Sequence, residues 1–235
     1  MNEILIVPDV HGRNFWEPAL EYPGKIIFLG DYTDPYPQEG FTQEDAYSGL
    51  LKIIDFKQQN PERVTLLIGN HELHYFDKHF QASRFSDKYY KKYHSILTEE
   101  TAGLFQLCKQ MDNYLFIHAG VTKGWYDRYK NILQSIGDDL ETQLNCFFIE
   151  NKEAFFEISH YRGGFHSSGS PLWADIHELF YEQEPFDNEI VQVIGHTHIP
   201  DKNPLIEKKF ILTDNAQLYL LKNGKIKKWV KKNDE

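Results

Sequence analysis

Cysteine is scarce in this chain, because Cys108 and Cys146 are the only two among 235 residues. Two cysteines cannot build the disulfide framework of a small secreted scaffold, and their spacing matches no zinc-binding or redox motif. Long apolar runs are missing too, since no window approaches the roughly 18 apolar residues of a transmembrane helix. The chain does not start with a positively charged stretch followed by an apolar one, the pattern of a secretion signal. We therefore expect buried, reduced thiols in a cytoplasmic protein without a membrane segment.

Positive charge is also in deficit, with 25 Lys and Arg residues against 35 Asp and Glu residues and a formal net charge of −10. Nucleic-acid backbones are held by positive surfaces, so we expect no nucleic-acid binding. The length suits one compact domain with a sizeable core, and we expect a single domain over residues 1–235. Nothing in the sequence specifies an oligomeric state.

Strand-like and helix-like segments alternate along the first third of the chain. Apolar, β-branched runs bounded by Gly or Pro predict buried strands at 4–7, 26–29 and 64–68. Residues 42–60 place apolar side chains at helical spacing behind a Thr42 cap, and Pro61 ends this helix. Such alternation indicates βαβ units and a largely parallel sheet. Further strands are predicted at 114–117, 191–194, 210–212, 218–221 and 226–230, with an Asn223-Gly224 hairpin turn between the last two.

Five short polar motifs lie at or directly after predicted strands. In chain order they are Asp9-Val10-His11-Gly12, Gly30-Asp31-Tyr32-Thr33-Asp34, Gly69-Asn70-His71-Glu72, His118-Ala119-Gly120 and Gly195-His196-Thr197-His198. Ligands of open α/β sheets bind at the carboxyl ends of the strands, so we expect these side chains to meet at one edge. A mixed set of carboxylate, amide and imidazole ligands suits Mn, Fe or Zn better than Ca or Mg. The motifs therefore predict a polynuclear metal site.

Spacing within the motifs supports chelation. Asp9 and His11 lie two residues apart, as do His196 and His198, and this spacing places both side chains of a pair on one face of an extended segment. Asp31 follows Gly30, which leaves its carboxylate room to bridge two ions. Two ions about 3.5–4 Å apart can hold a phosphoryl group, lower the pKa of a water and stabilise the leaving oxygen. The pattern therefore predicts a metal-dependent phosphoesterase.

The motif series resembles the calcineurin-like metallophosphoesterases, and within them the phosphoprotein phosphatase branch of serine/threonine phosphatases and symmetric dinucleotide tetraphosphatases. The positions of Asp34 and Glu72 and the segment 171–175 favour this branch. The resemblance covers residues 4–216. It implies an α/β fold, a two-sheet β-sandwich flanked by helices, with a dinuclear metal site at the strand ends.

The resemblance also implies a role for each motif residue. The first ion is held by Asp9, His11 and Asp31, joined by His198 in the pattern of the broader superfamily. The second ion is held by Asp31, Asn70, His118 and His196. The general acid that protonates the leaving oxygen is His71, and Asp34 orients and charges its imidazole. A carboxylate partner raises the pKa of a histidine, which suits an acid.

One departure from the family pattern affects phosphate binding. The arginine that follows the Asp34 position in the family is Pro35 here, and a bidentate arginine–phosphate contact is hard to replace. The resemblance places a second phosphate-binding arginine at Arg162. Arg13, directly after Gly12, is a candidate substitute for the missing one.

The polar and aromatic segment 74–113 lacks strand-like runs, and we expect helices there that cap one side of the site. Four further histidines are expected to be surface or capped residues without a role: His74, His79, His94 and His177.

The expected function is hydrolysis of a phosphate monoester by a hydroxide that two divalent ions (Mn, Fe or Zn) activate. The substrate is a phosphorylated protein, as for a serine/threonine phosphatase, or a small phosphoester. One alternative is a hydrolase of nucleotides or dinucleotide polyphosphates, or a phosphodiesterase. Another is a catalytically silent scaffold of the same fold, although such a scaffold would be free to lose His71 and Asp34.

Overall fold

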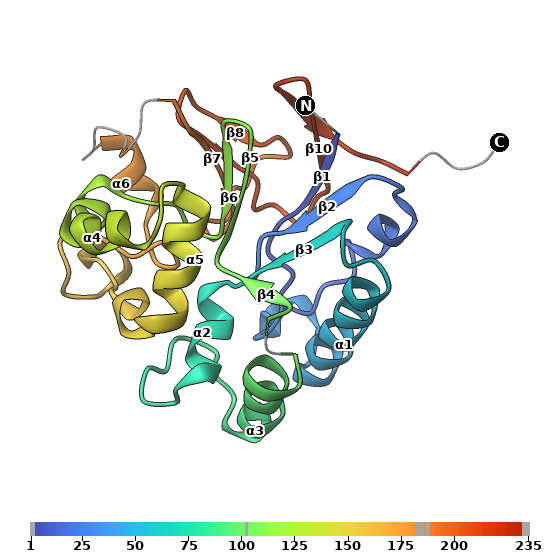
Figure 1. Ribbon diagram of the computed structural model, residues 1–235. Helices are drawn as coiled ribbons and strands as arrows, with labels where there is room; N and C mark the ends of the chain where they lie inside the picture. Colours follow the sequence, from blue (N-terminus) through green and yellow to red (C-terminus); the bar gives the residue numbers. More distant parts are fainter. Residues whose placement is uncertain (1–2, 102, 182–185, 187–188, 232–235) are drawn as a thin grey trace.

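Two β-sheets form the centre of the molecule, and helices cover their outer faces (Figure 1). The computed structural model describes residues 3–101, 103–181, 186 and 189–231. This arrangement confirms the predicted α/β fold of two sheets flanked by helices. Within the described ranges, no helix has both the length and the apolar character needed to cross a membrane.

The first sheet has six strands in the order β11-β10-β1-β2-β3-β4. Their bounds are β1 Ile4–Val7, β2 Lys25–Phe28, β3 Val64–Leu67, β4 Phe105–Gln106, β10 Tyr219–Lys222 and β11 Lys225–Lys228. Strands β1 to β4 run parallel, and β10 pairs antiparallel with β1. The β10–β11 hairpin turns at Asn223 and Gly224, whose φ angles of 49° and 73° are the left-handed conformations that Asn-Gly adopts readily.

The second sheet has five strands in the order β5-β6-β7-β9-β8. Their bounds are β5 Cys108–Met111, β6 Tyr114–Ile117, β7 Val191–Ile194, β8 Leu205–Ile206 and β9 Phe210–Leu212. Strands β6, β7 and β9 run parallel, while β5 and β8 are antiparallel strands at the two edges.

Helices lie on both outer faces of the pair of sheets (Figure 1). The α-helices of the described residues are α1 Gln43–Gln59, α2 Asn70–Phe76, α3 Asp87–Ser95, α4 Lys123–Ile136, α5 Leu140–Glu150 and α6 Ile176–Tyr181. Helix α1 begins with the predicted cap, in which the Thr42 side chain accepts from the Asp45 backbone and the Asp45 carboxylate accepts from that of Thr42.

Alternation of side chains along the central strands separates the core into layers. On β1, Ile4 and Ile6 point between the two sheets and join Phe116 of the second sheet in one buried cluster. Leu5 and Val7 point to the opposite face and join the cluster that contains the apolar side of α1. A strand buried on both faces needs a continuous apolar run, which explains the sequence of β1.

The helical prediction for residues 74–113 is wrong at its carboxyl-terminal end. Helices α2 and α3 and a π-helical turn at Ile96–Glu100 occupy most of the segment, but β4 and β5 follow. Strand β5 is only half-buried and carries Lys109 and Gln110, so it shows no apolar run. It is defined by antiparallel pairing with β6, a tertiary contact that local sequence does not display.

Candidate metal centre and active site

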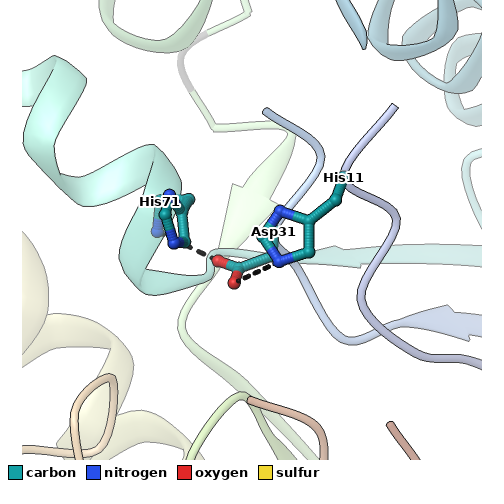
Figure 2. Close-up of side chains that lie close together, drawn as sticks. All are labelled: His11, Asp31 and His71. Atoms are coloured by element: carbon teal, nitrogen blue, oxygen red, sulfur yellow. Dashed lines mark hydrogen bonds and ion pairs between the residues drawn. The ribbon is translucent and has the colours of Figure 1, made fainter. Parts of the chain in front are cut away.

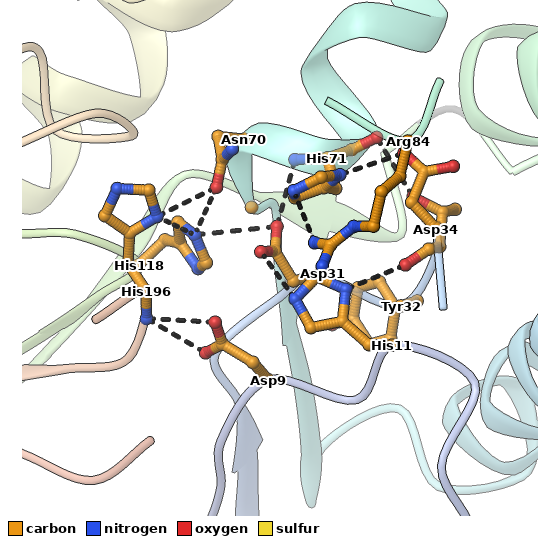
Figure 3. Close-up of polar contacts among 12 residues, drawn as sticks. Asp9, His11, Asp31, Tyr32, Asp34, Asn70, His71, Arg84, His118 and His196 are labelled. Carbon is orange, nitrogen blue, oxygen red and sulfur yellow. Dashed lines mark hydrogen bonds and ion pairs between the residues drawn. The ribbon is translucent and has the colours of Figure 1, made fainter. Parts of the chain in front are cut away.

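The predicted site residues lie where the parallel strands of both sheets end (Figure 3). Asp9 and His11 follow β1, Asp31 and Asp34 follow β2, Asn70 and His71 begin α2 after β3, His118 follows β6, and His196 follows β7. All of them except His196 are buried, with no more than 5% of the surface of any one exposed. Strand ends that are far apart in the sequence therefore place these polar side chains in one interior site.

Four potential ligand atoms converge on one side of this site. The Nε2 atom of His118 lies 2.9 Å from Oδ1 of Asn70, 3.1 Å from Nδ1 of His196 and 3.5 Å from Oδ1 of Asp31. The Nδ1 atom of His196 lies 2.9 Å from the same Asn70 oxygen. This is the set proposed from sequence for the second ion.

The hydrogen bond on the far side of the His118 ring determines what its Nε2 atom can do. Nδ1 of His118 lies 2.9 Å from the carbonyl oxygen of Leu29, which can only accept, so Nδ1 carries the hydrogen. Nε2 is then left with a lone pair that faces the oxygens of Asn70 and Asp31. A group of acceptors facing one another is satisfied by a cation, so these residues fit a metal ion.

The ring of His11 is held in the same way on the other side of Asp31. Its Nδ1 atom donates to the carbonyl oxygen of Thr33 at 2.9 Å, and its Nε2 atom lies 3.2 Å from Oδ2 of Asp31. The two carboxylate oxygens of Asp31 therefore face different histidines, Oδ2 toward His11 and Oδ1 toward His118 (Figure 3). A carboxylate shared by two ions needs this arrangement.

Asp9 lies beside this set. Both of its carboxylate oxygens accept from the backbone N–H of His196, at 3.0 and 3.1 Å. A Cβ at Gly195 would lie only 2.1 Å from Oδ1 of Asp9, so glycine is required there. Burial, followed by the negative charge of Asp31, raises the pKa of Asp9 to about 7. A divalent cation would relieve this repulsion between buried carboxylates.

His198 is not brought into the cluster. Its side chain is exposed, and in the described part of the chain it belongs to none of the close groups of metal-ligating atoms. The backbone explains this, because His196 has a φ of 66°. The two-residue spacing places side chains on one face only in an extended segment, and a left-handed residue breaks that pattern.

His71 lies between the carboxylates of Asp31 and Asp34. Its backbone N–H donates to Oδ1 of Asp31 at 2.9 Å, and its Nδ1 atom lies 2.9 Å from Oδ2 of Asp34 (Figure 2 shows the contact with Asp31). Its Nε2 atom lies 2.9 Å from Nη2 of Arg84. Because a guanidinium can only donate, Nε2 accepts and the ring hydrogen lies on Nδ1, directed at Asp34.

Asp34 raises the pKa of His71 as predicted, but the net pKa is lower than that of a free histidine. Burial lowers the pKa of His71 to about 4, and this outweighs the opposite effects of Asp31 and Asp34.

Asp34 connects several groups behind His71. Its Oδ2 atom also lies 2.6 Å from Nε2 of His74, and its Oδ1 atom accepts from the hydroxyl of Tyr75 at 2.5 Å. Burial acts to raise the pKa of Asp34, but the hydrogen bonds from His71 and His74 outweigh it and hold the pKa at about 2. Of the two predicted states of His74, surface or capped, the first is wrong because His74 is buried, and both of its ring nitrogens have partners. The side chains of His79 and His177 are exposed, as predicted.

The two arginines proposed from sequence are both engaged with carboxylates. Nε and Nη2 of Arg13 lie 2.6 and 2.8 Å from the two oxygens of Glu39. Nε of Arg162 lies 2.7 Å from Oδ2 of Asp175, and its Nη2 donates to the hydroxyl of Thr197.

Sequence reasoning missed Arg84, which contacts His71. A signal was present, because the family arginine is absent at Pro35 and Arg84 is the only arginine in the segment 74–113 that was expected to cap the site.

Glu72 organises the backbone that carries these residues. Its two oxygens accept from the backbone N–H groups of Asp31, Tyr32, Thr33 and Gly69 and from the hydroxyl of Thr33, at 2.8 to 3.1 Å. One buried carboxylate therefore joins the loop after β2 to the start of α2 and sets the position of Asp31.

Glu72→Gln is expected to lower the free energy of unfolding of the metal-free protein by about 3 kcal/mol. The glutamine amide group would place its own N–H donors against buried backbone N–H groups, which would then lack an acceptor. Urea unfolding of the chelator-treated protein measures this change. Glu62→Gln, at an exposed position, is the matched control and should leave the free energy of unfolding within about 0.5 kcal/mol. Equal stability of the two variants would show that Glu72 does not organise the loop.

Comparison with known proteins agrees with this arrangement. A family model described as calcineurin-like phosphoesterase matches residues 3–227. A comparison with curated proteins found no match.

Solved structures with a similar fold include two phosphatases. The cold-active protein-tyrosine phosphatase of a psychrophilic Shewanella species has 17% sequence identity and a TM-score of 0.60, over 96% of this chain and 77% of that one. A protein serine/threonine phosphatase from Saccharomyces cerevisiae has 14% identity and a TM-score of 0.55, over 99% of this chain and 81% of that one. At these identities the likeness is one of fold.

Proposed function

The chain belongs to the calcineurin-like phosphoesterases and is a metal-dependent phosphoric ester hydrolase, and from this premise we propose that it hydrolyses phosphate monoesters with His71 as general acid. The position of His71 carries the proposal. Its backbone N–H donates to Asp31 (Figure 2), and Nδ1 of its ring lies beside Asp34 (Figure 3). An alkoxide is a poor leaving group that needs a proton, whereas the phosphate leaving group of an anhydride does not. A positioned acid therefore favours an ester substrate.

The proposed metal ligands are the residues that meet at the strand ends. Asp9, His11 and Asp31 would hold the first ion, and Asp31, Asn70, His118 and His196 the second. Exposed His198 is left out of this set. When bound, two divalent ions would supply Lewis-acid stabilisation of the phosphoryl oxygens and activate the attacking water. The mixed nitrogen and oxygen ligands suit Mn, Fe or Zn.

The protein's own part in proton transfer follows from the contacts of His71. The hydrogen bond from Nδ1 to Asp34 holds the ring plane and leaves Nε2 as the atom that exchanges a proton with the leaving oxygen. Burial lowers the pKa of free His71 to about 4. A phosphoryl dianion that binds beside the ring adds negative charge and raises this pKa, so the imidazole takes up its proton together with the substrate.

A substrate panel assayed with Mn tests the proposal. Phosphoserine, phosphothreonine and phosphotyrosine peptides and p-nitrophenyl phosphate represent monoesters, bis-p-nitrophenyl phosphate represents diesters, and a dinucleotide tetraphosphate represents anhydrides. We expect the highest kcat/KM for a monoester and no turnover after chelation. A higher kcat/KM for the diester or the anhydride would contradict the proposal, and a metal-loaded protein inactive on the whole panel would support a silent scaffold.

A further inference from the structure

Arg84 is a cation without a carboxylate partner at the edge of the proposed active site. In the described part of the chain, the ion pairs of arginine are Arg13–Glu39, Arg128–Glu157 and Arg162–Asp175, and Arg84 forms none. Its Nε atom is buried and has no hydrogen-bond partner among the described residues. A guanidinium that is partly removed from water without a compensating anion is a site for one.

The contacts of Arg84 place its guanidinium at the proposed active site. Its guanidinium lies over the ring of Tyr36, 3.6 Å from the centroid. Figure 3 shows its contact with His71, in which Nη2 lies 2.9 Å from Nε2 of the ring. Tyr36 in turn packs edge-on against the ring of His11, with centroids 4.9 Å apart. The charge of Arg84 therefore lies beside the proposed proton donor, and the ring of Tyr36 separates it from a proposed metal ligand.

The loop between α2 and α3 holds Arg84 in this place. Arg84 has a φ of 65°, a left-handed conformation that residues other than glycine rarely adopt. Hydrogen bonds on both sides of Arg84 join this loop to α2. Nδ1 of His74 accepts from the backbone N–H of Ala82 at 3.2 Å, and the hydroxyl of Tyr75 accepts from that of Ser86 at 3.1 Å.

The two side chains that hold the loop, His74 and Tyr75, also contact Asp34. His74 contacts Asp34 through its other ring nitrogen, and the Tyr75 hydroxyl donates to Asp34. The carboxylate that orients His71 therefore also fixes the loop that carries Arg84. A strained residue that is held by this many contacts, and that directs an unpaired donor into a site, indicates a functional position.

We propose that Arg84 is the arginine that binds the phosphoryl group, in place of the one missing at Pro35, and that it makes the site selective for monoesters. Nε and Nη2 would donate together to oxygens of the phosphoryl group. A monoester presents three non-bridging oxygens and a diester only two, so a donor pair additional to the metal ligands favours the monoester. This inference rests on the proposed function.

Arg84→Ala, Arg84→Lys and the control Lys88→Ala test the proposal. Lys88 is an exposed cation of the same segment, on α3. With Mn bound, Arg84→Ala is expected to lower kcat/KM for p-nitrophenyl phosphate by about 10²–10³-fold. It should also weaken the equilibrium binding of orthophosphate by at least about tenfold. The loss for bis-p-nitrophenyl phosphate should be much smaller, and metal content should not change.

Two further results complete the expected pattern. Arg84→Lys should recover only part of the activity, because an ammonium keeps the charge and loses the planar fork. Guanidinium ion added to Arg84→Ala should restore monoester hydrolysis, which a merely structural role of Arg84 would not allow. Lys88→Ala should match the wild type in every measurement.

Equal losses for the monoester and the diester, with unchanged orthophosphate binding, would overturn the proposal and assign Arg84 a structural role. Monoester activity of Arg84→Ala at the wild-type level would overturn it as well. If the wild type hydrolyses no monoester of the panel, the proposed function fails. Weaker orthophosphate binding by Arg84→Ala would then still support Arg84 as the anion-binding residue, and unchanged binding would overturn it.

Discussion

Replacing His71 with asparagine is expected to lower kcat for a phosphoserine peptide by about 10²–10⁴-fold, the usual contribution of a general acid. The bond from the His71 backbone to Asp31 does not depend on the side chain, so both metal ions should remain bound. The loss should be smaller for p-nitrophenyl phosphate, because a nitrophenolate leaves without a proton. Steady-state kinetics with both substrates, together with elemental analysis of the purified variant, measures these effects.

His79→Asn is the matched control for that experiment, because it makes the same change at a side chain that is 83% exposed. Its kinetics should be those of the wild type. Equal losses of kcat on the two substrates in His71→Asn would mean that His71 positions the phosphoryl group and does not protonate the leaving oxygen.

Replacing Asp31 with asparagine is expected to weaken the binding of both metal ions by at least about 100-fold. Loss of a residue that only hydrogen-bonds to a metal ligand weakens binding by up to about 100-fold, and loss of a shared ligand should cost at least as much. The reason is the shared position of its carboxylate, since Oδ1 lies 3.5 Å from His118 and Oδ2 lies 3.2 Å from His11. An amide keeps one oxygen and loses the negative charge. Calorimetric titration of the chelator-treated protein with Mn gives the stoichiometry and the affinities.

Asp138→Asn, at an exposed position, should bind two ions per chain like the wild type. One ion lost from Asp31→Asn with the other bound at unchanged affinity would show that Asp31 serves a single ion. Fewer than two ions in the wild type would contradict the proposed dinuclear centre.

Much of the site could be predicted from sequence because its residues follow directly on strands. The runs before Asp9, Asp31 and Asn70 are apolar on both faces, so their burial in one parallel sheet, and the meeting of their carboxyl ends, follows from local pattern. The hairpin at Asn223 also follows from local sequence, whereas the two-sheet arrangement was expected from the family resemblance.

Where the geometry departs from what the sequence led us to expect, the reason is tertiary structure. The pKa of His71 is decided by burial, which the neighbouring Asp34 does not reveal. His198 was assigned by a spacing rule that holds for extended backbone, and the left-handed conformation of His196 breaks it. Arg13 is paired with Glu39, a residue 26 positions away. Arg84 reaches the site from a loop whose course is set by contacts with His74 and Tyr75.

The backbone of the site has a consequence for how this chain could change over time. Non-glycine residues with positive φ include His11, Asp31, Asp34, Arg84 and His196, with values from 45° to 66°. Each such conformation costs about 1–3 kcal/mol that glycine would not incur. Replacing one of these residues with glycine would relieve the strain at that position and at the same time remove a side chain from the site. Stability of the backbone and the chemistry of the side chains therefore make opposite demands at these five positions.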